Sequence, residues 1–327
     1  MKVVYPTSFF PACLRIAVAM AALGCSLLEP MQSMGASSGI VGFYIVQIPA
    51  GNSAWTSGLV GVTLHEGSIV SVAADVDGKA LVTFDSPGWT VNEFNRHYAE
   101  PQSGVCAGLA IDILSNTADT LKLDTTPAAA GLVSGMTLVT RKHATLAGLL
   151  PDGGGFLPFN DSIGLFNSAG KQSNYFFHSG TQKWINSLGN DSSNVIIRPG
   201  QGFVIQLAAP INLVLGKGEI CHVKTTPTKI KVNANVPNLV GALNPLALTT
   251  TLGSLGMVSS LQAFNDSVVT LAAGSLAQTG TFLSNGSNFI NGGGQNATNT
   301  SLPGGASVVV NVDSAKNISL TPVTVAP

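Results

Sequence analysis

The sequence contains one unit written twice, and this repeat constrains the fold more than any other feature. Phe159-Asn160-Asp161-Ser162 recurs as Phe264-Asn265-Asp266-Ser267, 105 residues later. Self-similarity at a fixed period predicts two copies of one folding unit, over residues 137–224 and 236–325. The colinear matches at the same shift are Phe177 with Phe282, Ser179 with Ser284, Trp184-Ile185-Asn186 with Phe289-Ile290-Asn291, Gly189 with Gly294, Asn194 with Asn299, and Asn212 and Leu215 with Asn317 and Leu320. Upstream, Thr145-Leu146 and Leu149 match Thr251-Leu252 and Leu255 at a shift of 106.

Each copy is predicted to be a small all-β unit. Strand-like runs alternate with clusters of Gly, Asn, Ser and Pro, a spacing typical of a β-sandwich or small barrel. Helix is expected only as one or two turns at matching places, over 144–150 and 249–256. The runs in the first copy are Ser162 to Phe166, Tyr175 to Phe177, Val195 to Ile197, Gly202 to Leu207 and Ile211 to Leu215.

A Pro-Gly turn precedes one strand in each copy. Pro199, Gly200 and Gly202 lead into an alternating run, Phe203 to Leu207, and Pro303-Gly304 stands 104 residues after the first turn. Glycine at such turns is explained by a positive φ alone, so we interpret these residues as structural rather than ligand-binding. Trp184 and Phe289, which replace one another between the copies, are predicted structural residues of the two cores.

The first 36 residues have the pattern of an export signal. An apolar run from Ile16 to Leu28 is too short to span a membrane, and small residues at Gly35 and Ala36 suit a cleavage zone. The competing interpretation is a lipoprotein anchored at Cys25, although the residues before it depart from the usual lipobox. We therefore predict an export signal over 1–36, a secreted or cell-surface location, and no transmembrane span after its removal.

Residues 37–127 form a third predicted unit, an N-terminal β domain that is not a copy of the repeat. It opens with a nearly continuous apolar run, Val41 to Pro49, which is typical of a central strand. Asp75-Val76-Asp77-Gly78 is expected to be the hairpin turn between two later strands. The other expected strands are 58–64, 68–73, 79–84, 109–114 and 120–123. The predicted fold is therefore all-β, with three sandwich-like or barrel-like units, the last two being an internal duplication, and little helix.

Charge excludes one class of function. Only 9% of the residues are charged, against about 25% in a typical soluble domain. Without the signal's Lys2, Arg15 and Glu29, the 15 basic and 16 acidic residues become 13 and 15, a net charge of −2. A nucleic-acid-binding protein needs a basic footprint, so no nucleic-acid partner is predicted.

Two cysteines remain outside the signal, Cys106 and Cys221. An exported chain meets an oxidising compartment, where these residues either form a disulfide or stay as two buried free thiols. The sequence does not decide between the two.

No catalytic or metal motif stands out. The five histidines show no metal-ligand spacing, and there is no Gly-x-Ser-x-Gly elbow. Asp161 and Asp266 are weak calcium candidates, because Asx side chains more commonly cap turns. Trp55, Trp89 and Trp184 suit either cores or a sugar-stacking platform. No cofactor is predicted.

Five segments of the chain look familiar together: Gly42-Phe43-Tyr44, Gly51-Asn52, Gly108 to Ile111, Ser115 to Leu121 and Pro199 to Phe203. They resemble a family of uncharacterised exported proteins described from Verrucomicrobia. The resemblance covers about residues 40 to 217, and Trp184 matches a tryptophan that the family carries before its Pro-Gly-x-Gly turn. The repeat unit also looks like modules of large bacterial surface proteins, although the second copy departs from it at Phe289 and Ala306-Ser307. The resemblance implies a bacterial, exported, β-rich protein and no activity.

The sequence predicts a non-enzymatic exported protein with a structural or adhesive role at the cell surface, with self-assembly as one version. Its expected partners are itself or other surface proteins. The alternative is a glycan-binding module of the bacterial surface, and an enzyme with a noncontiguous site is a third hypothesis.

Overall fold

Strands dominate the structure, a computed structural model that describes residues 41–56, 61, 63–219, 226–241 and 249–321. Strands take 47% and helices 7% of these described residues, so the prediction of an all-β protein with little helix is confirmed. The chain after Ser38 forms one compact unit, built around three separate buried clusters. The predicted signal at 1–36, with Cys25, lies outside the described residues.

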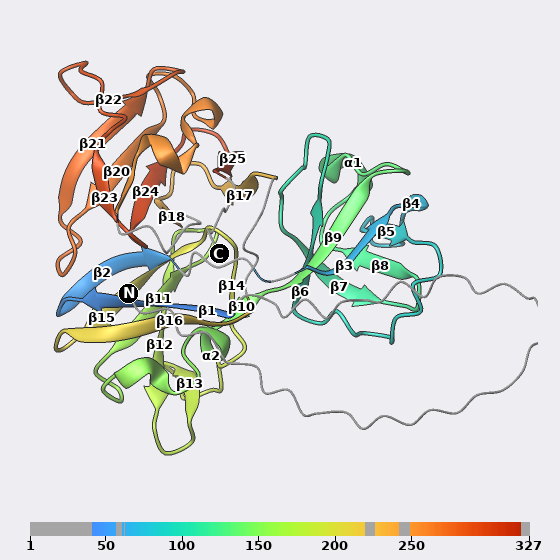
Figure 1. Ribbon diagram of the computed structural model, residues 1–327, viewed down its shortest axis with the longest axis horizontal. Coiled ribbons are helices and arrows are strands. Elements are labelled where there is room, and N and C mark those ends of the chain that lie inside the picture. Colours follow the sequence, from blue (N-terminus) through green and yellow to red (C-terminus); the bar gives the residue numbers. More distant parts are fainter. Residues whose placement is uncertain (1–40, 57–60, 62, 220–225, 242–248, 322–327) are drawn as a thin grey trace, which may run out of the picture. The chain divides into compact units, whose positions relative to one another are not determined.

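The first module takes its strands from two distant parts of the chain, 41–56 and 144–219. Its main sheet has the antiparallel order β13-β12-β11-β15-β2, and β1 pairs with β16 and β10 with β14. In Figure 1, blue β2 lies beside yellow β15. Ile48, Leu146 and Leu213 share one buried cluster with Trp184 and Phe203, so the core joins the main sheet to the β1–β16 pair and α2. The elements are β1 (Val41–Ile48), β2 (Gly51–Thr56), β10 (Ala144–Thr145), α2 (Leu146–Leu149), η1 (Gly153–Gly155), β11 (Ser162–Phe166), β12 (Gln172–His178), β13 (Lys183–Asn186), β14 (Ile196–Ile197), β15 (Gly202–Leu207) and β16 (Ile211–Glu219).

The second module has the same architecture within residues 228–320, coloured from gold to red in Figure 1. Its main sheet has the order β22-β21-β20-β24-β18, and β17–β25 and β19–β23 take the places of β1–β16 and β10–β14. Its buried cluster is separate from that of the first module. The elements are β17 (Thr228–Val232), β18 (Asn238–Gly241), β19 (Thr249–Thr251), η2 (Gly253–Leu255), η3 (Val258–Ser260), β20 (Ser267–Leu271), β21 (Gln278–Ser284), β22 (Phe289–Ile290), β23 (Ser301–Pro303), β24 (Ser307–Asn311) and β25 (Lys316–Leu320).

Between β2 and β10 the first module carries a seven-stranded sheet that curls into half a barrel. We call residues 63–142 the inserted sheet. Its strand order is β3-β9-β6-β7-β8-β5-β4, and Val82, Ile111 and Leu121 belong to its own core. In the second module only residues 242–248 separate the equivalent strands β18 and β19. The elements are β3 (Thr63–Ser68), β4 (Ser71–Ala74), β5 (Ala80–Thr83), β6 (His97–Pro101), β7 (Ile111–Asn116), β8 (Thr120–Leu123), α1 (Pro127–Ala130) and β9 (Thr137–Lys142).

These sheets divide the chain differently from the predicted boundaries at 37–127 and 137–224. β1 and β2 belong to the first module, because they pair with β16 and β15. β9 belongs to the inserted sheet, where it pairs with β3 and β6. The predicted boundaries followed the order of the chain, whereas an insertion splits one module into two pieces. β1 is also not the central strand that its apolar pattern predicts, since it forms a two-stranded sheet in which Ile45 is 61% exposed.

Along β12 and β21 the two modules are offset by 107 residues rather than 105. Phe177 lies opposite Trp184, whereas Ser284 lies opposite Phe289, the residue equivalent to Trp184. Phe177 therefore corresponds to Ser284, and its predicted match with Phe282 is wrong by two positions. The β20–β21 connection is two residues longer than the equivalent β11–β12 connection, and the β21–β22 connection is two residues shorter than the β12–β13 connection. The two changes cancel, so the offset returns to 105 residues after β21. The predicted match of Ser179 with Ser284 is displaced in the same way.

The Pro-Gly stretch of the first module is a type II turn. The carbonyl oxygen of Arg198 accepts a hydrogen bond from the Gln201 nitrogen at 3.0 Å. Pro199 fixes φ at the second position of the turn, and Gly200 has a φ of 76° at the third, where a side chain is disfavoured. The chain then enters β15 at Gly202, as the sequence predicts.

The second module has the same turn with the proline one position earlier. The Pro303 carbonyl oxygen accepts from the Ala306 nitrogen at 3.1 Å, and Gly305 has a φ of 79°. Pro303 therefore corresponds to Arg198, and Gly304 corresponds to Pro199. The turns align at a shift of 105 residues, rather than the 104 that their Pro-Gly letters suggest.

The two modules touch through reciprocal hydrogen bonds between equivalent residues. The Thr56 nitrogen donates to the Gly305 carbonyl at 2.9 Å, and the Gly241 nitrogen donates to the Gly200 carbonyl at 3.0 Å. Thr56 and Gly241 are equivalent because they pair with Gly202 and Ser307, which are 105 residues apart. Contacts of this kind, in which i meets j and j meets i, define a local two-fold axis.

Candidate functional site

A groove of about 720 Å³ is lined by both modules and the inserted sheet, and we call it the large groove. This volume is in the range of about 300–1,000 Å³ that is usual for ligand pockets. Its charged lining residues are Asp112, Asp124, Arg198, Lys229 and Lys231.

One wall of the large groove carries a cluster around Asp112. His143 Nε2 lies 3.0 Å from Asp112 Oδ1, and the Arg198 guanidinium donates to Oδ2. Burial raises the pKa of Asp112, but its close contacts with His143 and Arg198 outweigh burial and lower it. Because Arg198 begins the type II turn, the cluster links the inserted sheet to the first module.

A second ion pair lies in the interior of the inserted sheet. Arg141 Nε is 3.4 Å from Glu100 Oε2, and both side chains are almost fully buried. Arg141 also donates from Nη1 to the Gly61 carbonyl oxygen at 2.7 Å. A buried pair of this kind favours one arrangement of β6 and β9, because separating it would leave a charge without compensation.

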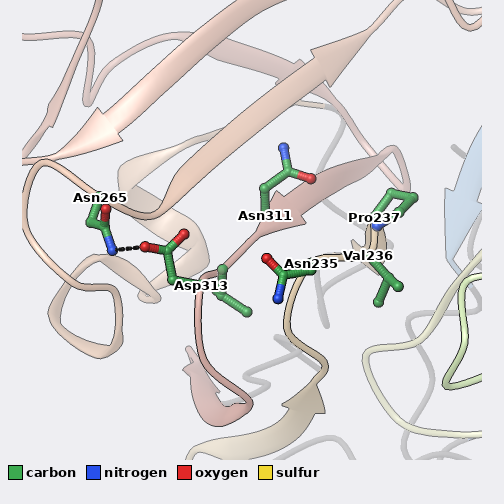
Figure 2. A pocket seen from close by; sticks show the side chains of 7 residues that line it. Asn235, Val236, Pro237, Asn265, Asn311 and Asp313 are labelled. Carbon is green, nitrogen blue, oxygen red and sulfur yellow. Dashed lines mark hydrogen bonds between the residues drawn. The ribbon is translucent and has the colours of Figure 1, made fainter.

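A small hollow of about 200 Å³ lies on the second module. Figure 2 shows Asn265 and Asp313 turned toward one another and joined by a hydrogen bond, with Asn311 and Asn235 beside them. The lining offers amides and one carboxylate, and it is smaller than usual ligand pockets.

The calcium candidate Asp161 accepts backbone hydrogen bonds at both carboxylate oxygens. The Leu157 nitrogen donates to Oδ2 and the Ala208 nitrogen donates to Oδ1, each at 2.7 Å. Asp161 is buried, and these bonds join the loop before β11 to the end of β15. The geometry is that of a turn cap.

The second calcium candidate, Asp266, makes the equivalent bonds. It accepts from the Gln262 nitrogen at 2.7 Å and from the Asp313 nitrogen at 3.4 Å. The Lys316 ammonium also pairs with it, which places a fixed positive charge beside the carboxylate. Within the described ranges, no group of three or more His, Cys, Asp or Glu side chains comes together as a metal site would require.

The tryptophans do not form a joint surface. Trp55 and Trp184 are buried in the core of the first module, and Trp89 packs against the core of the inserted sheet. The Trp184 indole donates to the Leu150 carbonyl oxygen at 3.0 Å. Phe289, its equivalent, is fully buried and needs no acceptor. The structure therefore gives no support to a sugar platform made of tryptophans.

Cys106 is buried in the inserted sheet and forms no disulfide with any described residue. Burial raises the pKa of this thiol. Its proposed disulfide partner, Cys221, lies outside the described residues, so the pairing stays a prediction.

Asp75-Val76-Asp77-Gly78 is the hairpin turn between β4 and β5 that the sequence predicts. The Lys122 ammonium pairs with the carboxylates of both Asp75 and Asp77. The hydrogen bond from Lys122 is the main cause that lowers the pKa of Asp75. A lysine thus lies between the two carboxylates of this turn.

Sequence reasoning missed the most unusual feature of the repeated motif. Phe159 and Phe264 have φ angles of 61° and 58°, in the left-handed region that bulky residues rarely adopt. Their side chains are 60% and 67% exposed. The only sequence signal was the recurrence of the phenylalanine itself, 105 residues apart.

Comparisons of the chain with protein-family models, with curated proteins and with solved structures find no match. The resemblance to exported proteins of Verrucomicrobia stays a prediction, and the function is inferred from the geometry. In the part of the chain that the structure describes, no helix has the length and apolar character needed to cross a membrane.

Proposed function

We propose that this chain is an exported, non-enzymatic protein with a structural role at the cell surface, and that it assembles with further copies of itself. The observation that carries the proposal is the pair of exposed, left-handed phenylalanines. Phe159 and Phe264 occupy equivalent turns of the two modules.

A phenylalanine at this position costs stability. The left-handed conformation costs about 1–2 kcal/mol for a residue with a side chain, whereas glycine adopts it freely. Burial offsets little of this cost, because both residues are more than half exposed, and among the described rings the Phe159 ring meets only that of His178, edge-on, with 5.5 Å between centroids. Strain of this kind, retained in both copies at an exposed apolar residue, favours a contact made outside the chain.

Two equivalent contact points make the chain bivalent. A bivalent subunit binds a surface with gain from avidity, and it forms open-ended assemblies when the contact is with another copy. The low charge of the chain, 9%, supports self-association because it limits repulsion between copies. An adhesive role would use the same two turns against another surface protein.

The test compares Phe159→Gly, Phe264→Gly and the double variant by sedimentation velocity over a wide range of concentration. The mature wild type is expected to form species larger than a dimer. Each single variant, with one contact left, is expected to stop at a dimer, and the double variant to stay monomeric. Glycine suits the left-handed turn, so the free energy of unfolding should change by no more than about 1 kcal/mol.

Leu188→Ala is the matched control, since Leu188 is 81% exposed in another turn of the first module. It should assemble like the wild type. A wild type that stays monomeric at every concentration, or a double variant that assembles normally, would overturn the proposal.

A further inference from the structure

We propose that the large groove binds an acidic oligosaccharide, a segment of a polysaccharide that carries carboxylates. This proposal does not depend on the phenylalanine contacts, because Phe159 and Phe264 do not line the groove.

In the part of the chain that the structure describes, two lysines in the lining of the large groove have no carboxylate to balance their charge. Asp112 is paired with Arg198, and Asp124 is paired with Lys79 at 2.6 Å. Lys229 and Lys231 have no ion pair among the described residues, and the Lys229 ammonium donates to the Val105 carbonyl oxygen at 2.6 Å. In a chain with a net charge of −1, this groove therefore attracts an anion.

The two lysines are presented together on one face of β17. Residues two positions apart on a strand point to the same side, so Lys229 and Lys231 flank one stretch of the groove. Asn317 lies opposite Lys231 on β25, which places an amide beside an ammonium. A row of two cations and an amide suits a chain of regularly spaced carboxylates and hydroxyls.

The rest of the lining suits sugar rings. The amide nitrogens of Asn167 and Gln201 have no partner among the described residues, while their oxygens accept backbone hydrogen bonds. Free amide donors bind hydroxyl oxygens, and the Phe166 ring supplies a flat apolar contact for the carbon face of a sugar. An acidic peptide would use the cations but would leave this combination of amides and aromatic ring without a matching group.

The probe is a tetrasaccharide of galacturonic acid, and its methyl ester is the neutral match with the same rings. Isothermal titration calorimetry with the full mature protein should show binding of the acid and much weaker binding of the ester. Affinity for the acid should fall as salt rises from about 50 to about 500 mM, because the lysines are near the surface.

Lys231→Gln should weaken binding about fivefold or more, and the double variant with Lys229→Gln more than about tenfold, since each removes a charge-assisted bond. Lys183→Gln is the control, because Lys183 is a half-exposed lysine of β13 and neither it nor its partner Asp191 lines the groove. Circular dichroism checks that each variant is folded.

Three results would overturn the proposal. They are absence of binding by the acid, equal binding of the ester, and an affinity for a polyglutamate peptide that matches the acid and depends on Lys231 in the same way. The last would assign the groove to acidic peptides. Lys231→Gln should leave sedimentation unchanged, because self-assembly is proposed to use the phenylalanine turns. A failure of oligosaccharide binding is therefore distinguishable from a failure of self-assembly.

Discussion

Gly202 and Ser307 occupy equivalent positions in the two modules and lie directly against each other. A methyl group built on Gly202 would come within 2.5 Å of the Ser307 hydroxyl oxygen. The second equivalent pair, Thr56 and Gly241, meets in the same way, with 2.2 Å between the Thr56 Cβ and a methyl group on Gly241. At both places a residue without a side chain faces a residue with one.

The first prediction concerns this contact. Gly202→Ala should lower the free energy of unfolding by about 1–3 kcal/mol, because the added methyl group overpacks a closed site. Chemical denaturation of the single variant measures the loss. Ser307→Gly in the same chain should restore most of it, since it vacates the space that the methyl group needs. A double variant as unstable as Gly202→Ala alone would show that the strain has another source.

The second prediction concerns the turn cap of the repeated motif. Asp161→Ala should destabilise the protein by on the order of 3 kcal/mol, because it leaves the Leu157 and Ala208 nitrogens without acceptors. Urea unfolding gives the value. Asp85→Ala, at an exposed position, serves as the control and should change stability by less than about 0.5 kcal/mol. Equal effects of the two substitutions would contradict the capping role.

The third prediction is a loss of stability in mild acid that involves His65. Its ring lies 5.6 Å from Phe84 and 4.8 Å from Trp89, and its Nε2 is buried without a hydrogen-bond partner. Burial lowers the pKa of His65 below 6.5, although nearby Glu66 acts in the opposite direction. The unfolded chain therefore binds the proton more readily, and stability falls as the pH drops through 6.5.

Denaturation at about pH 7.5 and about pH 5.5 measures this loss. His65→Phe should reduce it, because the aromatic contacts stay and the titrating group is gone. Part of the loss of stability in acid should remain in this variant, since burial lowers the pKa of His97 as well. An unchanged pH dependence in His65→Phe would show that other groups are responsible.

The fourth prediction concerns Asp112 at lower pH. Its folded-state pKa is below 3.8, so its contribution to stability is present above that pH and is lost as the pH falls through the folded value. Asp112→Asn should be less stable than the wild type near neutral pH, and the difference should shrink in acid. Unfolding curves across this range measure both effects, and a constant difference at every pH would contradict the assignment.

The sequence predicts local structure well wherever neighbouring residues decide it. The turn at Pro199 and Gly200 and the alternation that follows place β15 at its observed bounds, 202–207. The turns that begin at Asn186 and Asn291 are also decided locally. In each turn the asparagine side-chain oxygen accepts hydrogen bonds from the backbone nitrogens two and four residues later.

The sequence fails where distant segments decide the structure. Nothing in β1 or β2 shows that their partners lie beyond the inserted sheet, because strand pairing is not encoded by composition. The large groove needs Arg198 from the turn before β15, Asp112 from β7 and Lys231 from β17, so no local pattern could predict it. The conformation of Phe159 is hidden for another reason: local energetics disfavour it, and a local rule therefore predicts its absence.

The local two-fold axis has a consequence for how this interface could change over time. In a dimer of two identical single modules, every substitution at the axis would appear twice and meet its own copy. Joining the modules in one polypeptide removes that constraint, so threonine can face glycine at one point and glycine can face serine at the next. The covalent link thus allows the two halves to diverge into a matched, non-identical pair, which two separate products of a single gene could not become.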